Sequence, residues 1–419
     1  MKQYDSYKDA AIPWIETIPT HWNEMRAKYM FQKENRVPRD TDEVITCFRD
    51  GIVTLRKNRR TTGFTESFKE IGYQGIRKGD LVIHQMDAFA GSTGISDSDG
   101  KATPVYSVCT PKSDEFLSPY YAKVIRNMGL NGFIQSLYRG IRERSSDFRY
   151  ETFGRQILPL PPRAEQENII KFIESKTLNI DTYVAERERE LQLLNELKES
   201  EIANVITRGL NPNVKMKESQ NGFIGAIPAH WQERKIKYCF TERSEKNHPD
   251  EPVLCATQSQ GVIPQSMYQN RVVVVNKGFE GLKFVKVGDF VISLRSFEGG
   301  IEYAYYQGII SAAYTVLTPI EDSHADYFKL LFKSQPFIQL LQTCVTGIRE
   351  GQNINYEMLG RKFIPIPPYE EQKAIVAYIA DKSTKINALI HELESEIEYL
   401  KEYKQKLIAD CVTGQIKVD

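Results

Sequence analysis

The sequence Leu158-Pro-Leu-Pro-Pro-Arg-Ala-Glu-Gln166 returns, with small changes, as Ile364-Pro-Ile-Pro-Pro-Tyr-Glu-Glu-Gln372. The two copies lie 206 residues apart, and each precedes a long segment with helical periodicity. Proline fixes φ and interrupts the element before it, so each diproline predicts the rigid start of a helix. The chain is therefore expected to contain one structural plan twice.

Other short motifs repeat at offsets of 209 or 207 residues. They are Ile18-Pro-Thr-His-Trp22 with Ile227-Pro-Ala-His-Trp231, Gly79-Asp80 with Gly288-Asp289, and Gly140-Ile-Arg-Glu143 with Gly347-Ile-Arg-Glu350. Offsets that drift by so little indicate two homologous units with small loop insertions. Between the motifs the two sequences differ widely, as expected if both units perform the same kind of task on different targets.

We predict an α/β (α+β) fold with a pseudo-two-fold internal repeat. Residues 1–160 and 215–366 are expected to form two homologous globular domains. Residues 161–214 (a helix and a linker) and 367–419 (a C-terminal helix) follow them. Short strands are expected at Asp80–His84, Asp289–Ser293 and Val272–Val275, with helices near Pro119–Gln135 and His324–Leu341.

The two helical segments carry apolar residues at alternating steps of four and three, which indicates a helix–helix seam. The seam positions are Ile180, Val184, Arg187, Leu191, Leu194, Lys198, Glu201 and Val205 in the first segment, and Ile386, Ile390, Leu393, Ile397, Leu400, Lys404, Leu407 and Cys411 in the second. A helix of about 45 residues is roughly 65 Å long and cannot bury such a stripe alone. We therefore expect the two helices to pack on each other.

Lys198 and Lys404 occupy the same seam position in the two segments. A polar group in a seam can fix the register of two helices at a cost in stability. Alternatively, each lysine lies at a helix edge and extends its ammonium into water, which the sequence slightly favours.

Composition limits the class of protein. The chain has 419 residues with 55 Lys+Arg and 55 Asp+Glu, so overall basicity does not indicate a nucleic-acid partner. Six scattered cysteines predict reduced thiols and no metal site, and no signal peptide or membrane span is expected. We expect a cytoplasmic protein. Phosphate-loop, dinucleotide-binding and hydrolase motifs are missing, so no catalytic residue is proposed.

Charge is distributed unevenly along the chain. The net charge is +4 over residues 1–160 and +2 over 215–368, but −3 in each of the segments 161–214 and 369–419. The basic run Arg49, Arg56, Lys57, Arg59 and Arg60 suits a loop that binds phosphates, although a solvated loop is the more common meaning of such a run.

Arg142 and Arg349 recur within the repeated Gly-Ile-Arg-Glu motif. Each can bind a guanine edge or a phosphate, or alternatively form a structural salt bridge with the adjoining framework. Gln85 and Arg295 follow the predicted strands and differ between the units, so they are candidates for adenine and guanine readout. Residues at strand ends are also common at the edge of a core.

Taken together, the repeated Ile-Pro-x-His-Trp, Gly-Asp, Gly-Ile-Arg-Glu and Pro-Pro-x-x-Glu-Gln motifs resemble the specificity subunit of a type I restriction–modification system. The resemblance spans nearly the whole chain. It implies two target-recognition domains, each followed by a helix, with the helices packed as an antiparallel coiled coil. Such a subunit binds double-stranded DNA without catalysis, and each domain reads one half of a split site while the helices set the gap.

The resemblance also implies partners. Two modification subunits would use S-adenosylmethionine to methylate adenine N6 after base flipping, and two motor-nuclease subunits would join for restriction. No cofactor is expected on this chain itself. Two alternatives stay open: the specificity component of a related system with a fused methylase and nuclease, and a coiled-coil scaffold whose two domains bind proteins.

Overall fold

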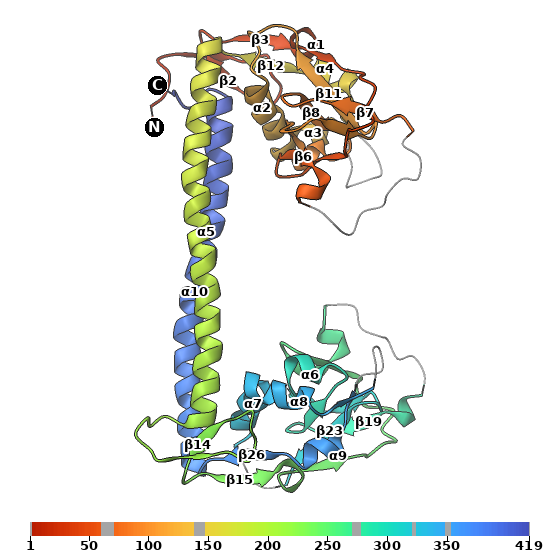
Figure 1. The fold of residues 1–419 in the computed structure, drawn as a ribbon, viewed down its shortest axis with the longest axis vertical. Coiled ribbons are helices and arrows are strands. Elements are labelled where there is room, and N and C mark those ends of the chain that lie inside the picture. Colours follow the sequence, from red (N-terminus) through yellow and green to blue (C-terminus); the bar gives the residue numbers. More distant parts are fainter. Residues whose placement is uncertain are drawn as a thin grey trace. The chain divides into compact units, whose positions relative to one another are not determined.

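The computed structural model describes residues 2–59, 71–137, 147–269, 278–320, 324–347 and 353–418. The chain divides into two compact units: unit 1 comprises Met1–Arg187 with Ser395–Asp419, and unit 2 comprises Glu188–Glu394. Each unit combines a mixed α/β globular part with segments of the long helices α5 (Arg163–Arg208) and α10 (Tyr369–Val412) (Figure 1). The predicted α/β class with two long helices is confirmed.

Unit 1 is built around a four-stranded antiparallel sheet. Its strand order is β4 (Phe31–Lys33), β11 (Tyr106–Pro111), β8 (Leu81–His84) and β9 (Thr93–Ile95). The first three residues of β8 are fully buried, as expected for the central strand of a covered sheet. The helices are α1 (Ala27–Met30), α2 (Ser118–Leu130), α3 (Phe133–Ser136) and α4 (Tyr150–Arg155).

Smaller two-stranded sheets and short 3-10 turns surround this core. The strands are β1 (Tyr7–Asp9), β2 (Thr17–Pro19), β3 (Asn23–Arg26), β5 (Ile45–Cys47), β6 (Val53–Leu55), β7 (Gln74–Ile76), β10 (Gly100–Ala102) and β12 (Ile157–Leu160), and the 3-10 turns are η1 (Arg56–Asn58) and η2 (Ala88–Ala90). The helix predicted near Pro119–Gln135 is divided at Gly132, whose φ of +83° is incompatible with a continuous helix.

Unit 2 repeats this architecture. Its main sheet has the order β16 (Phe240–Arg243), β23 (Thr315–Pro319), β20 (Phe290–Ile292) and β21 (Glu302–Tyr303). The helices are α6 (Ser296–Gly299), α7 (Ala325–Lys333), α8 (Gln335–Gln342) and α9 (Tyr356–Gly360). The helix predicted near His324–Leu341 is interrupted at Ser334, where the backbone is extended (ψ 144°) and α8 begins with a proline in its first turn.

The remaining elements of unit 2 are also short. The strands are β13 (Met216–Glu218), β14 (Ala226–Pro228), β15 (Gln232–Lys235), β17 (Leu254–Thr257), β18 (Gly261–Pro264), β19 (Lys283–Val285), β22 (Gly308–Ile310), β24 (Val345–Thr346), β25 (Asn353–Ile354) and β26 (Phe363–Ile366), and the 3-10 turns are η3 (Ile236–Tyr238), η4 (Gln265–Met267) and η5 (Phe279–Gly281). The strand predicted at Val272–Val275 lies outside the described residues.

The repeated Gly-Asp motif forms the turn before the central strand in both units. Gly79 has a φ of +91° and Gly288 one of +98°, which suits the third position of a type II turn. The carboxylate of Asp80 accepts the backbone N–H of Arg77 at 2.7 Å, and Asp289 accepts that of Lys286 at 2.8 Å. Both residue types in the motif are therefore explained by local backbone geometry.

Segments of α5 and α10 lie side by side and run antiparallel within each unit (Figure 1). In unit 1, the start of α5 and the end of α10 contribute Ile173, Leu407 and Cys411 to one core. In unit 2, the end of α5 and the start of α10 contribute Val205 and Ile375 to another. Every predicted seam residue is buried or half-buried, whereas most residues between them are exposed.

The two seam lysines differ from the favoured expectation. Instead of extending along the helix edge into water, each ammonium reaches a polar side chain on the other helix. Lys404 Nζ lies 2.6 and 2.7 Å from the two carboxylate oxygens of Asp181 in unit 1, and Lys198 Nζ lies 2.7 Å from Asn387 Oδ1 in unit 2. Asp181 and Asn387 are themselves 206 residues apart, so the repeat extends to the polar pairs of the seam.

All six cysteines are free and five of them are buried. Within the described ranges, no group of His, Cys, Asp or Glu side chains is arranged to hold a metal ion. Over the same part of the chain, no helix has the length and apolar character needed to cross a membrane.

Candidate nucleic-acid interface

The Ile-Pro-x-His-Trp and Pro-Pro-x-x-Glu-Gln motifs meet in space in each unit. In unit 1, one oxygen of Glu165 (Oε2) accepts hydrogen bonds from Trp22 Nε1 and His21 Nε2, both at 3.0 Å. In unit 2, Glu371 Oε2 accepts from Trp231 Nε1 at 3.0 Å and from His230 Nε2 at 2.9 Å. We call these groups the helix-start clusters, because each ties the first turn of a long helix to its globular part.

The glutamine that follows each of these glutamates is buried and bonded to backbone. Gln166 accepts the N–H of Leu117 at 2.9 Å and donates to the carbonyls of Glu115 and Pro161. Gln372 donates to Pro367 O at 2.8 Å, while its Oε1 has no partner among the described residues. The most specific sequence motif is thus a structural joint rather than a binding site.

The far ends of the long helices are held in a matching way. The hydroxyl of Tyr120 on α2 donates to Val412 O at the end of α10, at 2.8 Å. The hydroxyl of Tyr327 on α7 donates to Ile206 O near the end of α5, at 3.1 Å. Burial raises the pKa of both tyrosines far above the usual value of 10, so both remain neutral donors. Each globular part therefore contacts both long helices.

Because the repeated residues serve the framework, the variable segments are the candidates for recognition. In unit 1 these are the β5–β6 hairpin turn (48–52) and the loop after β8 (85–92). In unit 2 they are the β17–β18 hairpin turn (258–260) and the segment after β20 (293–300). We refer to them as the hairpin turn and the strand loop of each unit.

The predicted basic run is largely paired with acids. Lys57 Nζ lies 2.6 Å from Glu43, and Arg59 lies 2.7 Å from Asp50 and over the ring of Phe48. Arg56 Nε donates to Thr46 Oγ1 at 3.4 Å. Arg60 lies outside the described residues. Exposed ion pairs of this kind contribute only about 0–1 kcal/mol, so a phosphate can replace the acid at small cost.

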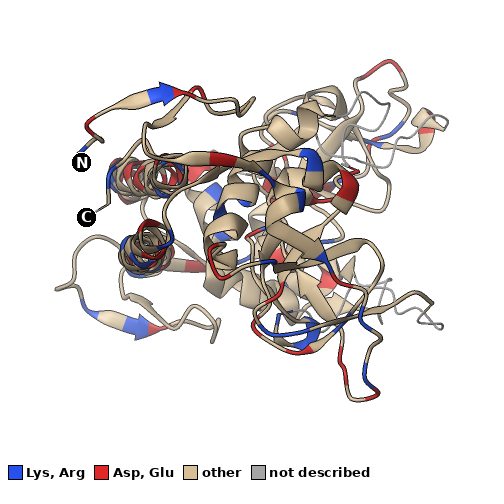
Figure 2. Cartoon of the chain, turned by 90° about the horizontal axis from the view of Figure 1, so that it is seen from above, with Lys and Arg blue, Asp and Glu red and all other residues tan. Residues whose placement is uncertain are grey.

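The structure connects the hairpin turn and the strand loop of unit 1 directly. Arg49 in the turn pairs with Asp87 in the loop at 2.9 Å. Figure 2 shows Lys and Arg interspersed with Asp and Glu along the ribbon.

The remaining predicted DNA-binding residues have different surroundings in the structure. Arg142 and Arg349 lie outside the described residues, so their role stays a prediction. Gln85 directs its side-chain amide toward Pro104 O and Ser107 Oγ, at 3.3 and 3.4 Å, as a residue at the core edge does. Arg295 is exposed at the start of α6, in the strand loop of unit 2.

His84, the last residue of β8, shapes the strand loop of unit 1. Its Nδ1 accepts the N–H of Asp87 at 3.1 Å, and its ring packs edge-on against Tyr106 with centroids 4.7 Å apart. Burial lowers the pKa of His84, which favours the neutral imidazole that this hydrogen bond requires.

Sequence reasoning missed two exposed apolar side chains in these loops. Met86 is 45% exposed in the strand loop of unit 1, and Leu294 is 43% exposed in that of unit 2. Apolar contact with the thymine methyl group is one form of base readout, so both are candidates. Their position directly after a buried strand was the available signal, but only polar residues were considered there.

Over residues 184–399, slightly more than half of the chain, the sequence matches the family described as type I restriction modification DNA specificity domain. The chain belongs to this family. Among curated members, it is 27% identical over 274 residues to the MjaX specificity subunit of Methanocaldococcus jannaschii, covering 62% of this chain and 59% of that protein. It is 24% identical over 285 residues to the MjaVIII specificity subunit of the same organism, covering 62% of each. The chain thus spans about three fifths of the curated relatives it matches.

Two solved structures share the fold of this chain. One chain, from a study of complex assembly and conformational transition in a type I restriction–modification system, superposes with a TM-score of 0.67 at 17% identity, covering 95% of this chain and 99% of that one. The HsdS subunit of Thermoanaerobacter tengcongensis gives a TM-score of 0.52 at 17% identity, covering 95% and 98%.

Proposed function

We propose that this protein is the DNA-recognition subunit of a type I restriction–modification system. The observation that carries the proposal is the contrast within the repeat. The helix-start clusters and the tyrosine contacts recur in both units, whereas the hairpin turns and strand loops differ in sequence. Such a chain would present two different reading surfaces on one framework, and so recognise a split, asymmetric DNA site.

The proposal assigns no chemistry to this chain. Modification subunits would bind S-adenosylmethionine and methylate adenine N6. This chemistry would lie on those subunits because a methyltransferase must extrude the target base into its own pocket. Two such subunits, and two restriction subunits, are the partners that the family resemblance implies. Membership of the specificity-domain family supports this assignment over a scaffold that binds only proteins.

The helix pair is proposed to set the gap between the two half-sites. Supporting this role, α5 is a continuous helix of 46 residues and α10 one of 44. Polar pairs across the seam, Lys404 with Asp181 and Lys198 with Asn387, would resist slippage of one helix along the other.

The deciding experiment is an adenine-methylation map of a bacterial genome expressing this chain together with its co-encoded methyltransferase. Strains with either protein alone serve as controls. The expected result is a new split, asymmetric motif that requires both proteins. A stable complex that produces no motif would contradict the proposal and favour the scaffold. If the methylase that supports the motif also carries the nuclease, the system belongs to the fused type.

A further inference from the structure

Each unit has a cationic side chain at the equivalent position, and this side chain connects the hairpin turn of that unit to its strand loop. Arg126 on α2 donates through Nη1 to the carbonyl oxygens of Arg49 and Gly91. Lys333 on α7 donates through Nζ to Gln258 O at 3.1 Å and to Gly299 O at 2.9 Å. In each unit the first carbonyl belongs to the hairpin turn and the second to the strand loop.

Position in the repeat supports the equivalence of these two side chains. Arg126 and Lys333 are 207 residues apart, and each follows by six residues the tyrosine that donates to the end of a long helix. In each unit, a cation on the helix that carries this tyrosine therefore bridges two loops whose own sequences have diverged. Hydrogen bonds from a charged donor are roughly twice as strong as neutral ones, so each bridge is a substantial restraint.

Close packing leaves little freedom around the bridges. A Cβ added to Gly91, which has a φ of +87°, would lie 2.6 Å from Arg126 Nη1. A Cβ added to Gly299 would lie 2.8 Å from the side chain of Gln258. Gly91 therefore allows the strand loop of unit 1 to approach the cation and the hairpin turn, and Gly299 allows that of unit 2 to approach the hairpin turn.

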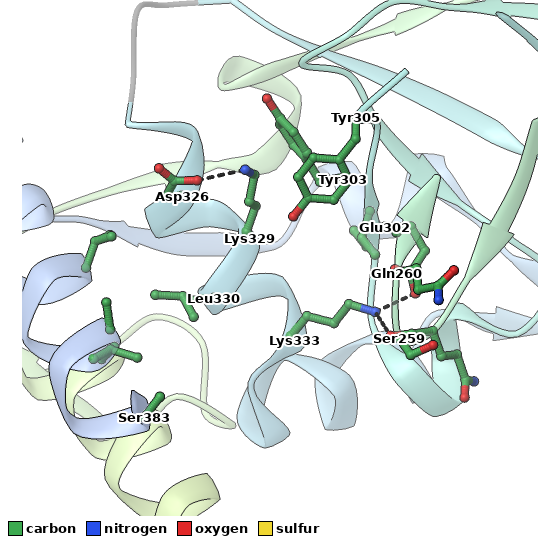
Figure 3. A pocket seen from close by; sticks show the side chains of 16 residues that line it. Ser259, Gln260, Glu302, Tyr303, Tyr305, Asp326, Lys329, Leu330, Lys333 and Ser383 are labelled. Atoms are coloured by element: carbon green, nitrogen blue, oxygen red, sulfur yellow. Dashed lines mark hydrogen bonds and ion pairs between the residues drawn. The ribbon is translucent and has the colours of Figure 1, made fainter. Parts of the chain in front are cut away.

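The bridge in unit 2 lies on the wall of a cavity of about 640 Å³ between the hairpin turn, β21, α7 and α10 (Figure 3). Lys333 there also pairs with the buried carboxylate of Glu302. Lys329, one turn earlier on α7, points instead to the rings of Tyr303 and Tyr305 and pairs with Asp326 at 2.7 Å (Figure 3). Two lysines of one helix thus have separate partners, and only Lys333 holds the loops.

We propose that Arg126 and Lys333 are positioning residues for DNA recognition, each fixing the hairpin turn and strand loop of its own unit and thereby the specificity for one half of the DNA site. The inference rests on the proposed function. Productive readout needs groups held to within about 0.5 Å, which a loop achieves only when its backbone is restrained. Neither residue needs to touch a base to affect the choice of base.

The test compares methylation maps for Arg126→Met and Lys333→Met in the full chain with its methyltransferase. In Arg126→Met, methylation of sites with one mismatch in one half-site, measured relative to the cognate site, should be about tenfold higher than in the wild type. Discrimination against mismatches in the other half-site should not change. Lys333→Met should have the same effect in the opposite half. Arg126→Lys and Lys333→Arg retain a charged donor and should restore discrimination. Lys123→Met and Lys329→Met remove a cation one turn earlier and serve as matched controls.

Different failures have different meanings. A uniform fall in methylation with an unchanged motif would overturn the positioning role and leave only a structural one. Relaxation of the same half-site by both variants would also overturn it. Hydrogen exchange on the free protein is independent of DNA: the turn 48–52 should exchange faster in Arg126→Met, and an unchanged rate would exclude the tether. If the wild-type pair yields no motif, the proposed function itself fails.

Discussion

The imidazole of His84 links acidity to the shape of one strand loop. Folding lowers its pKa below the usual 6.5, so the unfolded chain binds a proton more readily than the folded one. The stabilising effect of neutral His84 is therefore complete above pH 6.5 and is lost as the pH falls toward the folded pKa.

We expect thermal unfolding of unit 1 between pH 7.5 and 5.5 to depend on this group. In His84→Asn, the amide oxygen can still accept from Asp87, but the side chain does not titrate, so the melting temperature should vary less with pH. His391→Asn, at an exposed position of α10, is the control. Equal pH dependence in the wild type and His84→Asn would contradict the assignment.

Glu165 and Glu371 offer a matched pair of single-residue tests. Replacing either glutamate by glutamine places an amide where a carboxylate accepts two N–H groups, and should lower the free energy of unfolding by about 1–3 kcal/mol. Glu165→Gln should affect hydrogen exchange in unit 1 and Glu371→Gln in unit 2. Glu186→Gln, exposed on α5, should change neither. If either variant lost hydrogen-exchange protection only in the unit that does not contain the replaced glutamate, the role of the helix-start clusters would be refuted.

At the scale of the elements, the proposed role of the helix pair in setting the gap between half-sites can be tested by changing the length of the helices. Inserting one heptad after Arg187 in α5 and another after Glu394 in α10 preserves the seam and adds about 10 Å, the rise of about three base pairs. The unread gap of the methylated motif should lengthen accordingly. A heptad inserted only in the linker 210–214 should leave the gap as it is. A constant gap in the double insertion would show that the helices do not set it.

Elements of this protein were more predictable than its interface. The repeat, the central strands β8 and β20, and the seam positions of α5 and α10 follow from local pattern, because burial imposes a period on the sequence. Division of the predicted helices at Gly132 and Ser334 was not foreseen, since each break depends on local backbone geometry. The bridges from Arg126 and Lys333 join residues 34 to 77 positions apart, and no local sequence pattern predicts such contacts.

For the molecule as a whole, residues near the C-terminus should determine the stability of the N-terminal unit. Leu407 on α10 is 2% exposed within the core of unit 1. Leu407→Ala should therefore destabilise unit 1 by about 2–5 kcal/mol while unit 2 retains its protection from hydrogen exchange. Leu389→Ala, at an exposed position of the same helix, is the control. Equal loss of protection in both units would contradict this.

The composition of unit 1 also affects how the protein is made. Unit 2 is one continuous stretch, Glu188–Glu394, but unit 1 requires Ser395 onward, and Lys417 N–H bonds to Lys2 O at 3.0 Å. At a synthesis rate of about 5–20 residues per second, the first-made domain must wait about ten seconds or longer for its last helix, whereas the second is already whole. On the ribosome, we therefore expect unit 2 to complete its contacts before unit 1, which leaves the early segment incompletely packed and open to chaperone binding in the meantime.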